Sequence, residues 1–276
     1  MTTALLGLGS NLGDRSLLLD FAVQRLRETH GILEVCASSY YETQPVGGPG
    51  NQPAFLNAAA RVETSLAAEE LFHEMQRIEQ EAGRTRETHW GPRTLDLDLL
   101  LFGTTISRHG MLIIPHRLLR FRRFVLEPAA EIAGDMIEPC SRCKVSDLWG
   151  QLQTMPPDFE IWCPIPGLGE QIRTELLAVN ALPRMDVFVW NEESNQEFIA
   201  RRNCKARFIC MPSEDWLKPE SLQNRNDPVR YQQIRRREKV LAENAELISH
   251  SANLLIGFEN TEDAVQQITM AISAMR

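Results

Sequence analysis

The chain has 276 residues, of which 43% are hydrophobic and 24% are charged, so it can bury the core of one or two globular domains. Its formal net charge of −8 argues against a protein that coats nucleic acid, although a local basic pocket could still bind an anion. It contains no apolar run of 18 residues, and no basic segment precedes a long apolar one at its start. We therefore expect no membrane association and a cytoplasmic location.

Apolar spacing predicts strands and helices in the order β, α, β, β, α, β over residues 1–102. Strands are expected at 4–8, 32–41, 55–63 and 95–102, and helices at 16–29 and 67–82. This is the split βαβ pattern of the ferredoxin-like fold, an α+β class in which one sheet carries helices on one face. A long mobile loop at 47–53, a short strand near 111–114 and a helix at 125–133 would complete a domain of residues 1–150.

The periodic pattern breaks at residues 151–158, which predicts a linker before a second domain of residues 159–276. Strands are expected there at 159–164, 185–190, 206–211 and 254–258, and helices at 170–179, 230–249 and 261–275. Strands that alternate with helices predict a smaller three-layer α/β domain with a largely parallel sheet.

The segment from Trp90 to Phe102 is the most informative part of the chain, because Asp96 and Asp98 interrupt an apolar run. On a strand these two carboxylates point to the same face, where they repel each other unless a cation neutralises them. Hard oxygen ligands of this kind suit Mg2+, especially when substrate phosphates complete its coordination. The alternative is a solvent-facing strand with two incidental acids.

Basic residues flank the acidic pair on both sides. They are Arg84, Arg86, His89 and Arg93 before it, and His116, Arg117, Arg120, Arg122 and Arg123 after it. Arginine matches phosphate oxygens with two parallel hydrogen bonds, so this density beside two metal-type carboxylates indicates a polyphosphate substrate bound with Mg2+. Without the acidic pair, a solvated basic surface would be the better interpretation.

Glycine and cysteine residues give weaker signals. Gly7, Gly9 and Gly13 match G-x-G-x-x-x-G, one residue longer than a dinucleotide fingerprint, and are better explained by close packing against a flat ligand or a loop. The six cysteines are irregularly spaced and are expected to be reduced. Cys140 and Cys143 form a C-x-x-C pair, but nothing in the sequence completes a zinc set, so metal or redox use is not favoured.

Six blocks of the sequence follow one another in the order seen in a known enzyme family. They are GLGSNLGD at 7–14, YETQPVG at 41–47, QPAFLNAA at 52–59, GRTR at 83–86, WGPRTLDLD at 90–98 and IPH at 114–116. Over residues 1–150 the chain resembles the 6-hydroxymethyl-7,8-dihydropterin pyrophosphokinases of the folate pathway. The Asp-Leu-Asp block with its Gly-Pro-Arg lead is highly specific to that family.

The resemblance implies that the chain transfers diphosphate from ATP to the hydroxymethyl group of the pterin and releases AMP, with two Mg2+ ions held by Asp96 and Asp98. The catalytic residues that it implies are Arg84, Arg86, Arg93, Asp96 and Asp98. The residues that it implies for ATP are Glu79, Arg84, Trp90, Arg93, Leu99, His116, Arg117 and Arg122. Those that it implies for the pterin are Gly9, Thr43, Gln44, Pro45, Val46, Phe55, Asn57, Trp90, Asp96 and Phe124. Without the resemblance, core packing explains Phe55, Asn57 and Phe124 equally well.

Residues 161–171, IWCPIPGLGEQ, resemble the phosphate loop of nucleoside and thymidylate kinases, but Glu170 stands at the lysine position and Gln171 at the Ser/Thr position. An anion there would repel phosphate. We expect a degenerate domain with a structural role or a homodimer contact, or else an unrelated α/β module. Two alternatives stay open for the whole chain, a second nucleotide-related activity in this domain and a regulatory protein that binds pterin and nucleotide.

Overall fold

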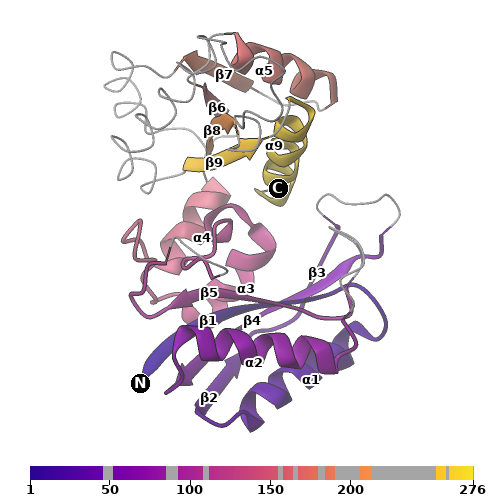
Figure 1. The fold of residues 1–276 in the computed structure, drawn as a ribbon, viewed down its shortest axis with the longest axis vertical. Helices are drawn as coiled ribbons and strands as arrows, with labels where there is room; N and C mark the ends of the chain where they lie inside the picture. The colour runs from indigo at the N-terminus through magenta and orange to yellow at the C-terminus, as the bar shows by residue number, and fades with distance from the viewer. Residues whose placement is uncertain are drawn as a thin grey trace, which may run out of the picture. The chain divides into compact units, whose positions relative to one another are not determined.

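The computed structural model describes residues 1–45, 52–84, 93–107, 112–154, 158–163, 167–179, 184–189, 206–212, 253–258 and 261–275. The chain divides into two compact units (Figure 1). One unit comprises Met1–Gln153 with Ala274–Arg276, and the other comprises Thr154–Ser273. None of the helices in these described ranges is both long enough and apolar enough to cross a bilayer.

The N-terminal unit is an α+β structure built on an antiparallel sheet (Figure 1). Its elements are β1 Thr2–Ser10, α1 Arg15–Glu28, β2 Ile32–Ala37, β3 Tyr41–Thr43, β4 Phe55–Thr64, α2 Ala68–Glu81, β5 Asp96–Phe102, the 3-10 helix η1 Leu119–Phe121, α3 Arg123–Ala133 and α4 Val145–Thr154. The strand order is β2-β4-β1-β5, and β3 also pairs with β4. All of these neighbours run antiparallel.

The helices α1 and α2 cover one face of the sheet, in front of it in Figure 1. Asp14 caps α1 by accepting a hydrogen bond from the Leu17 N–H, as the position of an aspartate before the helix predicts. The apolar stripes of both helices meet the inward side chains of β1, β4 and β5. The buried side chains of this core include Leu6, Leu8, Leu19, Leu26, Val62, Leu71, Met75, Ile78, Leu97 and Leu99.

The second face of the sheet is also covered, which corrects the expectation of helices on one face only. Leu5 and Ala59 alternate with the core residues along β1 and β4, and both are buried although they lie outside the first core. The helix α3 packs against β1, β3 and β4. This second face also carries the outward positions of β5, so helix α3 and the acidic pair share one side of the sheet.

Two predicted strands differ from the structure. The segment 32–41 is divided into β2 and β3, because the Ser39 N–H donates to the Glu131 carboxylate on α3 and the Ser38 hydroxyl accepts from the Ala59 N–H. Near 111–114 there is a single bridge between Ser107 and Ile114, and residues 108–111 lie outside the described ranges. The loop predicted at 47–53 falls mostly on residues 46–51, which also lie outside them.

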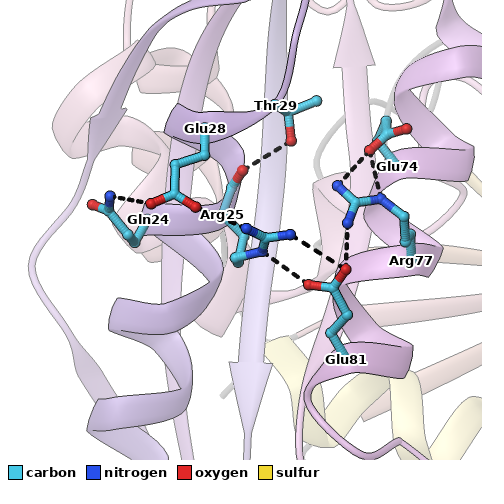
Figure 2. Close-up of polar contacts among 7 residues, drawn as sticks. All are labelled: Gln24, Arg25, Glu28, Thr29, Glu74, Arg77 and Glu81. Carbon is cyan, nitrogen blue, oxygen red and sulfur yellow. Dashed lines mark hydrogen bonds and ion pairs between the residues drawn. The ribbon is translucent and has the colours of Figure 1, made fainter.

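A group of charged side chains joins α1 to α2 along the exposed rim of the first core (Figure 2). Arg25 on α1 binds both oxygens of Glu81 on α2, at 2.8 and 3.3 Å, and also binds Glu28 at 2.8 Å. Arg77 joins Glu81 from the same helix. The hydrogen bond that Arg25 donates to Glu81 raises the pKa of Arg25 and lowers the pKa of Glu81. Because these groups are exposed, the network orients the helices more than it stabilises them.

The C-terminal unit contains β6 Asp158–Cys163, α5 Leu168–Val179, β7 Arg184–Val189, β8 Ala206–Pro212, β9 Asn253–Phe258 and α9 Thr261–Met275. Its strand order is β7-β6-β8-β9, and every neighbouring pair is parallel. The helix predicted at 230–249 lies outside the described residues. The predicted linker begins too early, because α4 continues through Thr154.

The first core makes a stability prediction. Leu6→Ala should lower the free energy of unfolding by about 2–5 kcal/mol, because it leaves a cavity between β1 and the two helices. Leu6 is fully buried at 0% exposure, whereas Leu17 on α1 is 64% exposed. Leu17→Ala is therefore the matched control and should change stability by less than about 0.5 kcal/mol. Urea unfolding, with hydrogen exchange of the β1 amides, measures both, and equal losses in the two variants would contradict this packing.

Candidate active site

Strand β5 directs Asp96 and Asp98 to the face opposite the first core. Leu97 and Leu99, which alternate with these aspartates along the strand, are buried in that core. Asp96 lies beside Gly9 and Asp98 beside Gly7 on the neighbouring strand β1. The predicted pair of carboxylates on one face is therefore present, and the two groups are partly accessible, with side chains 21% and 36% exposed.

Two arginines hold Asp96, one from each side of the segment 85–92. Arg84 Nη1 lies 2.7 Å from Asp96 Oδ1. Arg93 binds the other oxygen of the same carboxylate. Each carboxylate oxygen of Asp96 therefore has a guanidinium partner, and the negative charge is neutralised without any bound ligand.

Glu79 on α2 fixes the position of Arg84. Its carboxylate is buried, pairs with Arg84, and accepts the Leu97 N–H at 2.8 Å. A buried carboxylate requires such partners, because its desolvation is otherwise costly. Glu79 thus ties the end of α2 to β5 and orients the guanidinium that faces Asp96. The family resemblance implies a role in ATP binding for Glu79, and in the structure its carboxylate contacts Arg84 and the backbone of Leu97.

Asp98 faces an arginine and a histidine from the segment before α3. Arg122 Nη1 lies 3.6 Å from Asp98 Oδ2, and His116 Nε2 lies 4.0 Å from the same oxygen. Burial lowers the pKa of His116, although Asp98 opposes this effect, and burial likewise lowers the pKa of Arg122. The His116 Nδ1 accepts the Leu118 N–H at 3.3 Å, which turns Nε2 toward Asp98.

The other predicted half of the site lies across β1 from the carboxylates. Gly9 is flanked by Asp96 on one side and by Asn57 of β4 on the other. A Cβ at Gly9 would lie 3.3 Å from Asn57 Oδ1, so glycine keeps the floor between these two polar groups open. Asn57 is buried and donates from Nδ2 to Thr43 Oγ1 at 2.8 Å, and Phe55 pairs with Thr43 across the strands.

Phe124 lies at the start of α3, next to the acidic half of the site. The Arg122 guanidinium carbon is 5.6 Å from the centre of its ring, a cation–π contact. The same arginine therefore contacts an aromatic ring and faces Asp98. Phe124 is half-buried, so one part of the ring stays accessible.

The remaining predicted site residues have no contact given above. Val46, Arg86 and Trp90 lie outside the described residues, and Gln44 and Arg117 are exposed. Pro45 is half-buried after β3. The side chain of Leu99, which the resemblance assigns to ATP binding, belongs to the first core, on the face opposite Asp98. Strand alternation dictates this placement, and it leaves the backbone of Leu99 as its available part.

Asn11 is a central residue for which sequence analysis predicted no role. Its Oδ1 accepts the Arg93 N–H at 2.7 Å, and its own N–H donates to the Arg93 carbonyl at 3.1 Å. Its Nδ2 donates to Gln52 Oε1 at 3.2 Å and to the Pro53 carbonyl at 3.4 Å. Asn11 is 1% exposed and so joins the segments on both sides of the site. The glycine pattern around it was the only local signal.

Glu131 on α3 is a second missed residue. It accepts the Ser39 N–H at 3.0 Å, the Ser39 hydroxyl at 2.9 Å and the Tyr41 hydroxyl at 2.9 Å. These bonds fasten α3, which carries Phe124, to β3, which carries Thr43. The hydrogen bond to Glu131 raises the pKa of Tyr41. Because the partners are 92 and 90 residues apart, no local pattern could have revealed the contact.

The donor set fits a magnesium ion that is shared with a substrate. Within the described residues no group of three or more His, Cys, Asp and Glu side chains is arranged to hold a metal. Asp96 and Asp98 instead offer two carboxylates on one accessible face, and Mg2+ in phosphate-binding sites takes one or two carboxylates with substrate oxygens and water.

In the C-terminal unit the phosphate-loop resemblance can be examined only where α5 begins. Residues 164–166 lie outside the described ranges, and Gly167 has a φ of 80°. Glu170 is exposed and pairs with Arg173 at 3.1 Å, and Gln171 donates to Glu175 at 3.3 Å. Both side chains therefore bond along their own helix, and the degenerate phosphate loop stays a prediction.

Replacement of Asn11 tests its part in holding the site together. Asn11→Ala should lower the free energy of unfolding by about 1–3 kcal/mol, because it leaves the Arg93 N–H and the Pro53 carbonyl without their partner. Asn11→Asp keeps the acceptor for Arg93 but loses both donations. Gln24→Ala, which removes one exposed bond to Glu28, is the control. Hydrogen exchange at residues 52–54 should increase in both Asn11 variants, and exchange at residues 93–95 should increase in Asn11→Ala. Unchanged exchange in Asn11→Ala would refute the linkage.

Glu131 makes a prediction about pH. Burial raises its pKa, but the bonds from Ser39 and Tyr41 outweigh burial, and the net pKa lies below the ordinary 4.5. A lowered pKa stabilises the fold above the unfolded value, and that contribution is lost as the pH falls through the folded value. Glu131→Gln should therefore be less stable than wild type at pH 7, and the difference should shrink as the pH falls below about 4.5.

Thermal or urea unfolding across this pH range measures the effect of Glu131→Gln on stability. Glu127→Gln on the same helix is the control, because Glu127 forms an ion pair with Arg123, an exposed arginine of its own helix. A constant difference between Glu131→Gln and wild type from pH 7 to pH 3 would show that the ionised form carries no special stabilisation.

Known proteins with similar sequences fall into one family. The family model of 7,8-dihydro-6-hydroxymethylpterin-pyrophosphokinase (HPPK) matches residues 5–134. The 2-amino-4-hydroxy-6-hydroxymethyldihydropteridine pyrophosphokinase of Haemophilus influenzae is 43% identical over 142 residues, which cover 51% of this chain and 88% of that protein. The protein of the same name from Bacillus subtilis is 48% identical over 172 residues, which cover 62% of this chain and 97% of that protein.

Among solved structures, that of Plasmodium falciparum HPPK-DHPS wild type with pteroate aligns with 76% of this chain and 63% of its own, at 13% identity and a TM-score of 0.43. The family assignment rests on the sequence matches, which combine high identity with nearly complete coverage of the relatives. The chain belongs to the 7,8-dihydro-6-hydroxymethylpterin-pyrophosphokinase family.

Proposed function

We propose that this chain transfers the diphosphoryl group of ATP to the hydroxymethyl group of 6-hydroxymethyl-7,8-dihydropterin and releases AMP. Its family and the pyrophosphokinase activity in the names of its relatives support this function. The observation that carries it is the pair of carboxylates on β5, which arginines and one histidine surround on an accessible face of the sheet. These groups are Arg84, Arg93, His116 and Arg122.

In the proposed reaction, the hydroxymethyl oxygen of the pterin bonds to the β-phosphorus of ATP, and the bond from that phosphorus to the bridging oxygen of AMP breaks. The hydroxyl proton leaves to solvent. Negative charge on the transferred group must be neutralised throughout, and arginine forks supply this with directional hydrogen bonds. Arg84 and Arg93 are close enough to Asp96 to serve the same phosphate-bearing region.

Binding of the nucleotide requires an exchange of partners at Asp96. In the structure both carboxylate oxygens of Asp96 bond to arginines. Phosphate oxygens would replace this carboxylate as the arginine ligands, so one charge-assisted contact is exchanged for another. The carboxylates of Asp96 and Asp98 then become available to metal. Mg2+, when bound, supplies Lewis-acid neutralisation of the phosphate charge, and the two carboxylates would hold one or two such ions.

Residues on both sides of Gly9 suit a flat heterocycle. Phe55 offers an aromatic surface across β1 from the carboxylates, and Phe124 offers one beside Arg122. Asn57 with Thr43 offers directional hydrogen bonds. The open floor at Gly9 lies between these groups and Asp96. In this proposal the pterin lies over Gly9 with its hydroxymethyl group toward β5. Gln44, Pro45 and Val46 would line its edge from the segment after β3.

We also assign the activity to the domain predicted at residues 1–150 and its fold to the ferredoxin-like class. The antiparallel strand order β2-β4-β1-β5, with a helix between β1 and β2 and another between β4 and β5, supports this class. A regulatory protein that only binds pterin and nucleotide is not favoured by the family match. For residues 159–276, a homodimer contact and a second activity both stay predictions.

Neutralising either carboxylate tests the function. Asp96→Asn and Asp98→Asn should each reduce AMP formation from ATP, Mg2+ and 6-hydroxymethyl-7,8-dihydropterin by about 100-fold or more. The isosteric amide keeps the shape of the side chain but removes the charge. Asp135→Asn, at an exposed position after α3, is the control. Wild-type rates in both β5 variants, or AMP formation by wild type without the pterin, would refute the assignment.

A further inference from the structure

Glu138 is a buried carboxylate that the proposed reaction does not use. It lies in the turn between α3 and α4, beyond residues 5–134 of the family model, and is 1% exposed. Its Oε1 accepts the Cys140 N–H at 2.9 Å, and its Oε2 accepts the Ser141 N–H at 2.8 Å. The Glu138 backbone also pairs with Cys143 across the turn, at 2.9 Å. The carboxylate is therefore built into a closed turn and cannot reorient freely.

The cation that faces this carboxylate is Arg120 of η1. Its Nε lies 3.7 Å from Glu138 Oε2, and its side chain is 17% exposed. The basic residues from His116 to Arg123 were expected to serve one phosphate site, but the structure divides them. Arg122 faces Asp98, whereas Arg120, two residues earlier, faces Glu138. A buried carboxylate without such a cation would be strongly destabilised, so the pair constrains both partners.

The short segment between His116 and Arg122 is anchored along its length. At its start the His116 N–H donates to the Leu100 carbonyl of β5 at 2.9 Å. At its end the Arg122 carbonyl accepts the Leu126 N–H of α3 at 2.9 Å. Between them the side chains of Leu119 and Phe121 are buried, and Arg120 faces Glu138. A 3-10 turn is only weakly stable by itself, so the contact with Glu138 adds a charged restraint to this apolar anchoring.

We propose that Glu138, acting through Arg120, is a positioning residue that holds His116 and Arg122 toward Asp98 and so sets the affinity of this side of the site for the phosphate groups of ATP. The inference rests on the proposed function. It distinguishes the two halves of the site, because within the described part of the chain the Glu138 carboxylate bonds to its own turn and faces Arg120, away from β3 and β4. Its loss should therefore weaken ATP binding and spare the pterin.

The experiment uses the full chain with the variants Glu138→Gln, Arg120→Met and their combination. The glutamine keeps one oxygen for the turn but removes the charge that faces Arg120. Each single variant should raise the dissociation constant for Mg2+-ATP about tenfold, because a small displacement of His116 and Arg122 weakens their contacts with the phosphate groups. The KM for the pterin should stay within about twofold. The combined variant should be no worse than either single one, because both act through one contact.

Two further variants separate positioning from general stability. Arg120→Lys keeps the positive charge and should recover most of the ATP affinity that Arg120→Met loses. If Glu138→Gln does not fold, Arg120→Met provides the same test. Arg142→Met removes an exposed charge from the same turn and should leave ATP affinity unchanged. Calorimetric titration with Mg2+-ATP measures binding without turnover, and thermal unfolding records stability.

The outcomes are distinct from those for the proposed function. Unchanged ATP affinity in Glu138→Gln, or equal losses for ATP and pterin, would overturn the positioning role while leaving the activity intact. Additive losses in the combined variant would overturn the route through Arg120. A wild-type chain that binds ATP but forms no AMP would instead refute the proposed reaction, and the calorimetric comparison of variants would still decide the role of Glu138.

Discussion

The mutual repulsion of Asp96 and Asp98 is the constraint around which the N-terminal unit is arranged. Side chains two positions apart on a strand are about 7 Å apart, and two unit charges at that separation repel by about 2 kcal/mol at an effective dielectric constant of about 20. Arginines from separate segments offset this repulsion, and a histidine also faces Asp98. Arg84 arrives from the end of α2, Arg93 from the residues before β5, and His116 and Arg122 from the segment before α3.

One face of the sheet packs the first core, and the other face carries the candidate site. One face forms the apolar core with α1 and α2, and the other presents Gly9, Asn57 and the carboxylates. Because strand side chains alternate, every residue of β5 that packs the core fixes its neighbour on the polar face. Glu79 crosses this division, since it comes from the core side of α2 and yet binds Arg84 and the backbone of Leu97. The polar site is thus held by the same packing that stabilises the fold.

Sequence patterns predicted what depends on neighbouring residues. Period-two alternation was enough to find β5 and to orient Asp96 and Asp98, and helical spacing found α1 and α2. The same alternation, applied to Leu99, would have excluded its side chain from the site. What failed depends on distant partners. The interruption between β2 and β3 is caused by Glu131, and the importance of Asn11 arises from Arg93 and Pro53, which only folding brings together.

The basic residues after β5 also have partners that sequence patterns could not predict. Charge density alone groups Arg120 with Arg122, since both lie in one short segment. A 3-10 turn advances about 120° per residue, so residues two apart point in different directions, and each needs its own counter-ion. For Arg122 that partner is Asp98, and for Arg120 it is Glu138, which follows the end of the family model. The turn after α3 therefore completes the electrostatics of the phosphate side, and a unit that ended at residue 134 would leave Arg120 without this carboxylate.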